Sequence, residues 1–132
     1  MRIQVVTPHG TVLDEDVQEV TVPGVVGELG ILPGHLPIIT ALDIGVLSVR
    51  SGSERRTYAV NGGFLEMAQD KVIVVTETAE EASTIDVARA EAARKRAEDD
   101  LKHHATGSAE YETVRLALKR AATRLKAARA GK

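Results

Sequence analysis

Arginine side chains recur along the last third of the chain at spacings that gather them on one side of two helices. Arg89 and Arg96 are seven residues apart, and Arg120 and Arg124 are four apart. Residues separated by four or seven positions lie on the same side of an α-helix. Guanidinium groups held together repel unless an anion lies between them, and the planar arginine fork binds phosphate oxygens in pairs. The spacing therefore indicates a candidate polyphosphate site.

Two acidic residues near these arginines extend the candidate site. Glu80 and Asp86 could accept hydrogen bonds from a ribose hydroxyl or an adenine amino group. The same arginines are also typical of a solvated helix face, because Arg and Lys are mostly exposed in proteins. A third interpretation rests on residues 115–132, which contain seven basic residues and no acidic one and could dock on an acidic partner. Spacing alone leaves all three open.

Other residue groups indicate little chemistry. His103 and His104 are adjacent and would point about 100° apart on a helix, which makes a poor metal pair. Gly24, Gly27 and Gly30 match neither of the glycine-rich phosphate-binding patterns and predict tight turns instead. No nucleophile, histidine and acid combine into a catalytic set. We therefore expect no catalytic residue and no metal site.

Two helices must position the arginines. Residues 85–104 contain neither Gly nor Pro and are rich in strong helix formers. Ser83 or Thr84 can cap this helix, which places Asp86 in its first turn. After a four-residue break, Ser108 can cap a second helix. So short a link between two amphipathic helices predicts an antiparallel hairpin.

The hairpin register and seam follow from this arrangement. Counted outward from the break, Arg89 faces Arg124, and Arg96 lies near Ala117 to Arg120. The first helix presents a stripe of mostly alanine, and the second presents a heptad stripe. These residues are Ala90, Ala93, Ala97, Leu101 and His104, then Tyr111, Val114, Leu118, Ala121, Leu125 and Ala128. Alanine buries little apolar surface, so we expect a hairpin that can open, with a static hairpin as the alternative.

The preceding residues predict a β domain. Seven short apolar runs with strand-like patterning are separated by Gly, Pro, Asn and Asp. The runs are 3–7, 17–22, 27–32, 45–50, 57–60, 64–68 and 72–76. Asn61-Gly62-Gly63 is expected to form a hairpin turn. This pattern predicts a sandwich or flattened barrel over residues 1–84, followed by the helical hairpin over residues 85–132.

Composition and charge separate the same two units. Residues 1–84 contain five basic and twelve acidic residues, whereas residues 85–132 contain twelve basic and seven acidic ones. The net charge of −2 therefore hides one acidic and one basic half. The chain has no cysteine, no apolar run long enough to span a bilayer and no visible leader, so we expect a soluble protein that reaches a membrane only through a partner. Three aromatic residues leave little for nucleic-acid stacking.

Three motifs resemble one protein family. Residues 27–37, GELGILPGHLP, and residues 58–66, YAVNGGFLE, look like two signature stretches of the epsilon subunit of the F-type ATP synthase, which is named delta in mitochondria. Residues 85–90, IDVARA, look like the motif that opens its helical hairpin. The resemblance covers essentially the whole chain in order. It implies a ten-stranded β-sandwich followed by a two-helix hairpin.

The resemblance also implies a non-catalytic central-stalk subunit. Its sandwich would bind the gamma subunit and the membrane rotor ring of c subunits, with Glu28 and His35 near those contacts. The hairpin would switch between a state folded on the sandwich and an extended state that inhibits ATP hydrolysis and meets the catalytic beta subunit. The subunit would lie at the cytoplasmic face of a bacterial membrane without inserting into it.

In several bacterial members the folded hairpin binds ATP, and the resemblance carries that regulatory site onto seven residues of this chain. They are Glu80, Ile85, Asp86, Arg89, Ala90, Arg96 and Arg124. Whether magnesium accompanies the nucleotide stays open. A purely structural coupling subunit without nucleotide binding is the alternative.

Overall fold

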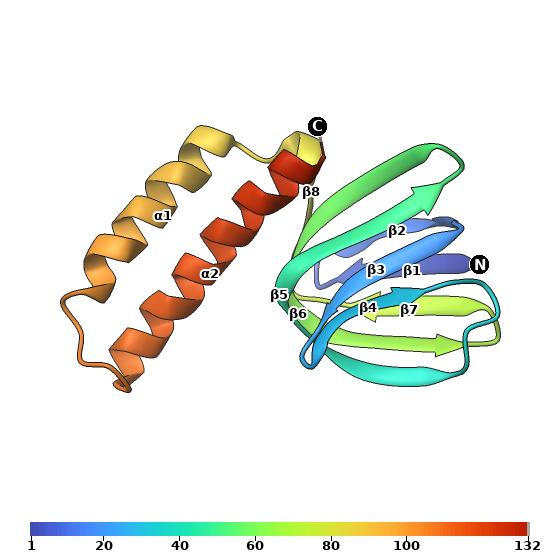
Figure 1. Ribbon diagram of the computed structural model, residues 1–132, viewed down its shortest axis with the longest axis horizontal. Helices are drawn as coiled ribbons and strands as arrows, with labels where there is room; N and C mark the ends of the chain where they lie inside the picture. The colour runs from blue at the N-terminus through green and yellow to red at the C-terminus, as the bar shows by residue number, and fades with distance from the viewer. Residues whose placement is uncertain (132) are drawn as a thin grey trace.

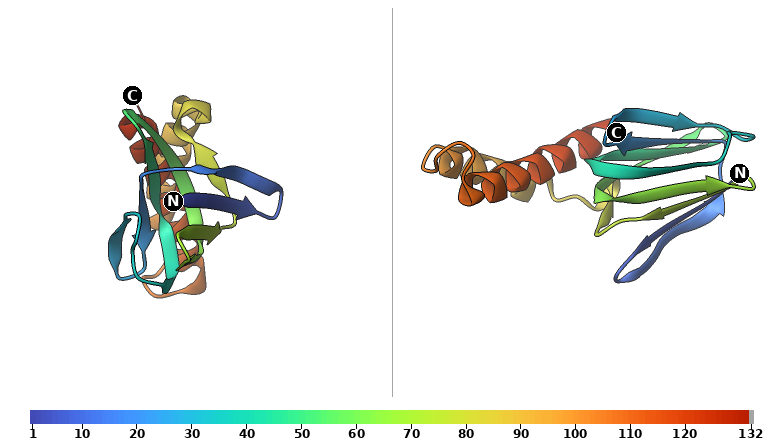
Figure 2. Two further views of the ribbon diagram at one scale, coloured as in Figure 1. Left: turned by 90° about the vertical axis from the view of Figure 1, so that its right-hand side faces the viewer. Right: turned by 90° about the horizontal axis from the view of Figure 1, so that it is seen from below.

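Alternating apolar residues build a β domain that folds into two facing layers (Figures 1 and 2). The computed structural model describes residues 1–131. Its strands are β1 (Arg2–Thr7), β2 (Gly10–Asp16), β3 (Glu19–Gly24), β4 (Gly27–Ile31), β5 (Ile38–Ser51), β6 (Glu54–Ala68), β7 (Lys71–Val75) and β8 (Ala79–Glu81). They are hydrogen-bonded in the order β2-β1-β7-β6-β5-β3-β4, with β8 paired to β6. The pair β1–β7 is parallel, and the other pairs are antiparallel.

One hydrophobic core lies between the layers. Strands β1 to β7 each contribute buried side chains to it, and Ile3, Val20, Leu47, Leu65 and Val74 are fully buried. Each such side chain stabilises the fold by roughly 1.5–3 kcal/mol. Among the described residues, no member of this cluster comes from a helix. The β domain therefore has a core of its own.

The predicted sandwich is confirmed, but its strand count and one turn differ from expectation. The described residues form eight strands, and the long β5 and β6 would give ten if each were counted as two. Asn61-Gly62-Gly63 is not a hairpin turn, because β6 runs through it and pairs with β5 on both sides. Before these residues β6 also pairs with β8, and after them with β7. Gly62 and Gly63 have φ angles of +76° and +113°, so this glycine pair lets one strand change partners.

Two helices follow a short 3-10 turn, η1 (Ala82–Thr84). They are α1 (Val87–Leu101) and α2 (Ala109–Ala130), and they form the predicted antiparallel hairpin (Figure 1). Ser108 caps α2, as predicted. The predicted cap of α1 is wrong, because Asp86 is the N-cap and not Ser83 or Thr84, which belong to η1. α1 also ends at Leu101, three residues earlier than expected, since residues 102–104 make turns with i−3 hydrogen bonds.

Of the two helices, α2 makes the main contacts between the hairpin and the β domain. α2 touches β5, β6 and η1, and α1 touches α2. Figure 1 shows α2 between α1 and the β domain, and Figure 2 shows the hairpin projecting from one end of that domain. The buried residues of α2 are mostly small: Ala121, Thr123, Leu125, Ala127 and Ala128. The contact is therefore shallow, and Lys132, the last residue of the predicted helical unit, lies outside the described residues.

Candidate functional site

A cavity of about 420 Å³ lies where the start of α1, the C-terminal half of α2 and β8 meet. All seven residues that the sequence assigned to a nucleotide site line this cavity, and Thr84 and Ala93 complete the lining. The cavity volume falls within the roughly 300–1,000 Å³ typical of small-molecule sites. The folding of the hairpin thus brings the predicted set together, because β8, α1 and α2 all contribute to the walls.

The N-terminus of α1 is fixed by its own side chain. Asp86 Oδ1 accepts a hydrogen bond from the backbone N–H of Arg89 at 3.0 Å, which caps the helix. The backbone N–H of Ile85 donates to the carbonyl of Ala82 at 3.2 Å, which ties the cap to η1. Asp86 therefore positions the backbone of Arg89, in addition to any role as a ligand acceptor.

Helical spacing places the rest of the α1 wall. Arg89, Ala93 and Arg96 follow one another at four and three residues and lie on one side of α1. Ala90 is 3% exposed and leaves space beside the arginines because it has only a methyl group. Ala93 was missed as a site residue, although its place between Arg89 and Arg96 in the helical repeat is a signal that could have identified it.

Three guanidinium groups and two carboxylates line the cavity. Arg124 Nε donates to Glu80 Oε1 at 2.8 Å, and each of these side chains is about one third exposed (36% and 37%). Arg89 and Arg96 are exposed and form no ion pair within residues 1–131. Two of the three cations therefore lack a protein anion. An arrangement of this kind favours a ligand with several negatively charged oxygens.

A second cavity of about 420 Å³, between the two helices, tests the hairpin register. Arg96 lines it together with Ala117 and Arg120. Arg89 and Arg124 share the first cavity. Both pairings agree with the register predicted from the sequence.

Thr84 is the other lining residue that the sequence did not identify. Its hydroxyl donates to the carbonyl of Glu81 at 2.7 Å, so it closes the η1 turn at the cavity wall. Its position just before Ile85 and Asp86 predicts only a helix cap. The 3-10 turn η1, which places Thr84 in the cavity wall, is not predicted by the sequence pattern.

The two predicted partner-contact residues do not come together. Glu28 lies at the beginning of β4 and lines a groove beside the C-terminal part of α2. His35 lies in the turn beyond the other end of β4, where its backbone N–H donates to the carbonyl of Leu32 at 3.1 Å. They would therefore meet separate parts of a partner surface.

The remaining residues add neither a metal site nor a membrane span. Within residues 1–131, no three His, Asp or Glu side chains are grouped closely enough to hold a metal ion. No helix of this part of the chain combines the length and apolar character needed to cross a bilayer.

Comparisons with known proteins agree along the whole chain. Residues 1–82 match the family described as ATP synthase, Delta/Epsilon chain, beta-sandwich domain. Residues 83–129 match the family described as ATP synthase, Delta/Epsilon chain, long alpha-helix domain. The boundary between these matches falls within η1, where the β domain passes into the hairpin.

Similar proteins and structures carry related names. The chain is 44% identical to ATP synthase epsilon chain 2 of Syntrophotalea carbinolica over 99% of its own length and 95% of that protein. It is 44% identical to the ATP synthase epsilon chain of Trichlorobacter lovleyi over 97% of its length and 93% of that protein. A chain of the Euglena gracilis mitochondrial ATP synthase, OSCP/F1/c-ring, superposes with a TM-score of 0.83 at 25% identity, covering 96% of this chain and 79% of that one.

Proposed function

Because the chain belongs to the ATP synthase delta/epsilon family and is a non-catalytic subunit of that enzyme, we propose that its folded hairpin binds ATP in the cavity between α1, α2 and β8. In its extended state the hairpin inhibits ATP hydrolysis. The observation that carries the proposal is the cavity lined by Arg89, Arg96 and Arg124, of which the first two have no anionic partner among residues 1–131. A triphosphate supplies the missing charge.

ATP acts in this proposal by mass action. The cavity walls come from β8, α1 and α2, so the cavity exists only while the hairpin is folded on the β domain. A ligand that binds one of two conformations shifts the population toward it. ATP therefore favours the folded hairpin and relieves inhibition.

The packing supports a hairpin that can leave the β domain. The β domain has a core without helical residues, and the buried face of α2 is mostly alanine and threonine. Separation of α2 therefore exposes little large apolar surface. A deep Leu- or Phe-rich contact would resist such a movement far more strongly.

The partners proposed for the β domain are the gamma subunit and the rotor ring of c subunits. Ile39, Phe64 and Val75 lie on neighbouring strands and are 74%, 61% and 51% exposed. Exposed apolar patches of soluble proteins mark interaction sites. Glu28 and His35, at the two ends of β4, are proposed to contribute polar contacts to these partners.

The partner proposed for the extended hairpin is the catalytic beta subunit. From Arg115 to the end of the described chain, α2 carries six basic residues and no acidic one, so an acidic segment of beta complements it. The subunit is then a peripheral component at the cytoplasmic face of a bacterial cell membrane, held there by the complex.

Calorimetric titration of the whole chain with ATP tests the proposal. We expect saturable one-to-one binding, and a parallel titration with excess chelator decides whether magnesium is required. An absence of binding heat at several temperatures, together with unchanged thermal unfolding in millimolar ATP, would refute it.

A second candidate function is a purely structural coupling subunit. It is favoured by one observation, the Arg124–Glu80 ion pair, which satisfies one arginine without any ligand. The same titration separates the two, because the structural subunit gives no binding with either magnesium or chelator.

A further inference from the structure

Two ion pairs tie α2 to the β domain within residues 1–131. Arg124 pairs with Glu80 at 2.8 Å, and Lys119 pairs with Asp43 at 2.7 Å. The Arg124–Glu80 pair lies in the proposed nucleotide cavity, so a phosphate that binds Arg124 competes with Glu80. Lys119 and Asp43 line a different groove, of about 660 Å³, between α2 and strands β3 to β6. A nucleotide in the first cavity therefore leaves the Lys119–Asp43 pair intact.

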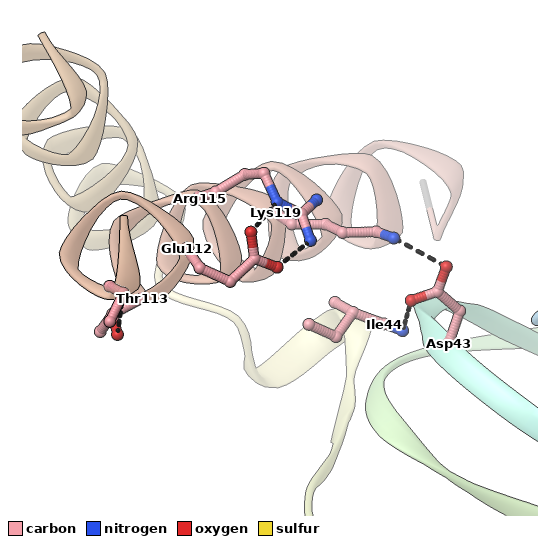
Figure 3. Close-up of polar contacts among 7 residues, drawn as sticks. Asp43, Ile44, Glu112, Thr113, Arg115 and Lys119 are labelled. Atoms are coloured by element: carbon pink, nitrogen blue, oxygen red, sulfur yellow. Dashed lines mark hydrogen bonds and ion pairs between the residues drawn. The ribbon is translucent and has the colours of Figure 1, made fainter. Parts of the chain in front are cut away.

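The carboxylate of Asp43 is held by its own strand as well as by Lys119. Asp43 lies in β5 where the regular pairing with β6 is interrupted between Leu42 and Ile44. Its Oδ1 accepts the backbone N–H of Ile44 at 2.8 Å, and its Oδ2 accepts Lys119 Nζ at 2.7 Å (Figure 3). A carboxylate that is already fixed loses little freedom when it forms the second bond.

The surroundings of this pair favour the ionised carboxylate. The hydrogen bond from Lys119 is the main cause that lowers the pKa of Asp43, and the bond from Ile44 and the charges of Lys119 and Arg115 act in the same direction against partial burial. Arg115 is held one turn away by two hydrogen bonds to Glu112, at 2.5 and 3.0 Å (Figure 3). Both cations come from α2, so the β domain presents the carboxylate and the helix presents the positive charges.

We propose that the Lys119–Asp43 pair is a ligand-independent latch that sets how often the hairpin leaves the β domain. This inference rests on the proposed function, because it requires a hairpin that can undock. The remaining α2 contact involves mostly small side chains such as Thr123 and Ala127. Even the modest stabilisation from one partly exposed ion pair therefore changes how often the hairpin undocks. The latch acts with or without nucleotide, whereas the Arg124–Glu80 pair is exchanged when phosphate binds.

Thiol labelling of the full chain measures undocking directly. The chain contains no cysteine, and Thr123 is 9% exposed in the face of α2 that meets the β domain, so Thr123→Cys gives a single reporter of similar size. Its labelling rate by an aromatic disulfide reagent follows the undocked fraction. If Thr123→Cys unfolds, Ala127→Cys, one turn further along, takes its place.

Breaking the Lys119–Asp43 pair should raise the labelling rate by a predictable factor. Partly exposed ion pairs contribute little individually, so we expect Lys119→Gln and Asp43→Asn each to raise the labelling rate about twofold to fivefold. The double variant that combines Asp43→Lys with Lys119→Asp exchanges the two charges, so its labelling rate should return most of the way to that of the parent. Lys126→Gln is the matched control, because Lys126 lines the same groove and forms no ion pair within residues 1–131.

The outcomes separate the latch from the proposed function. If Lys119→Gln and Lys126→Gln label at the same rate as the parent while ATP still slows labelling, the latch is wrong and the nucleotide site stands. If ATP leaves labelling unchanged in the parent and in every variant, the nucleotide switch is wrong. If Lys119→Gln accelerates labelling, the exchange restores it and Lys126→Gln has no effect, the latch is established.

Discussion

Arg89 and Arg124 both line the proposed nucleotide cavity, but we expect their replacement by alanine to weaken ATP binding by different amounts. Arg89 forms no ion pair within residues 1–131, whereas Arg124 is paired with Glu80 at 2.8 Å. Phosphate binding to Arg89 therefore adds an interaction. Phosphate binding to Arg124 replaces or shares an existing one.

The magnitudes follow from the two starting states. A hydrogen bond to a charged group contributes about 1.5–3 kcal/mol, so Arg89→Ala should raise the dissociation constant of ATP roughly 10- to 150-fold. A partly exposed pair such as Arg124–Glu80 is worth about 0.2–1 kcal/mol. Phosphate binding to Arg124 gives up this ion pair, which offsets part of the stabilisation from the new contact. Arg124→Ala should therefore weaken ATP binding by only roughly 1–2 kcal/mol, or about five- to thirtyfold in affinity.

Calorimetry of the full chain at fixed salt measures both constants. Lys95→Ala is the matched control, because Lys95 is an exposed cation of α1 that does not line the cavity and forms no ion pair among residues 1–131. Its replacement should change affinity by less than about twofold. The reasoning is refuted if Arg124→Ala weakens ATP at least as strongly as Arg89→Ala, or if Lys95→Ala matches either of them.

Three further perturbations test other parts of the chain. In a urea titration, Gly63→Ala should lower the free energy of unfolding by about 3 kcal/mol or more, because a Cβ there would lie 1.9 Å from the carbonyl oxygen of Val75 at a φ of +113°. Gly10→Ala is the control, since Gly10 has a φ of +121° but no atom within 4 Å of such a Cβ. It should lower the free energy of unfolding by only about 1 kcal/mol. Ala90→Leu should abolish calorimetric ATP binding by filling the cavity, while the melting temperature of the β domain stays unchanged. Asp43 has a lowered pKa in the folded chain, so its contribution to docking is present above its ordinary value of 3.8 and is lost as the pH falls through the lower folded value. Because labelling requires the thiolate, the rate at position 123 is divided at each pH by the rate of a fully exposed reference thiol. This ratio should rise in that acidic window, and less so in Asp43→Asn.

Local periodicity was enough to predict which arginines lie together, although not what they bind. The spacing of Arg89 and Arg96 fixes their side of α1, and a short antiparallel link fixes which part of α2 faces them. Both inferences depend on helix geometry alone, which tolerates small errors in helix ends. The structure moves the start of α1 to Val87 and its end to Leu101, yet all seven predicted residues line the cavity.

Strand pairing was harder to predict because it depends on distant neighbours. Asn61-Gly62-Gly63 has the composition of a hairpin turn, but β6 continues through it. A glycine is needed at position 63 because the backbone of Val75 lies too close for any side chain there, and that neighbour is distant in the sequence. The edge strand β2 (Gly10–Asp16) was missed because it is mostly exposed and lacks apolar alternation. The Lys119–Asp43 pair joins residues 76 positions apart, and no local pattern marks it.

The latch and the nucleotide are linked through the docked fraction of the hairpin. ATP binds the docked state alone in the proposed mechanism, so its apparent dissociation constant equals the intrinsic constant divided by the docked fraction. If the docked state already dominates, Lys119→Gln leaves that fraction near one and the ATP affinity unchanged, even though labelling at position 123 accelerates. If the undocked state dominates, labelling at position 123 is already near its limit and hardly accelerates, whereas the ATP affinity falls by the full factor by which the variant lowers the docking constant. Comparing the two measurements on one variant therefore gives the resting position of the switch, because Lys119 does not line the nucleotide cavity and can affect ATP only through docking.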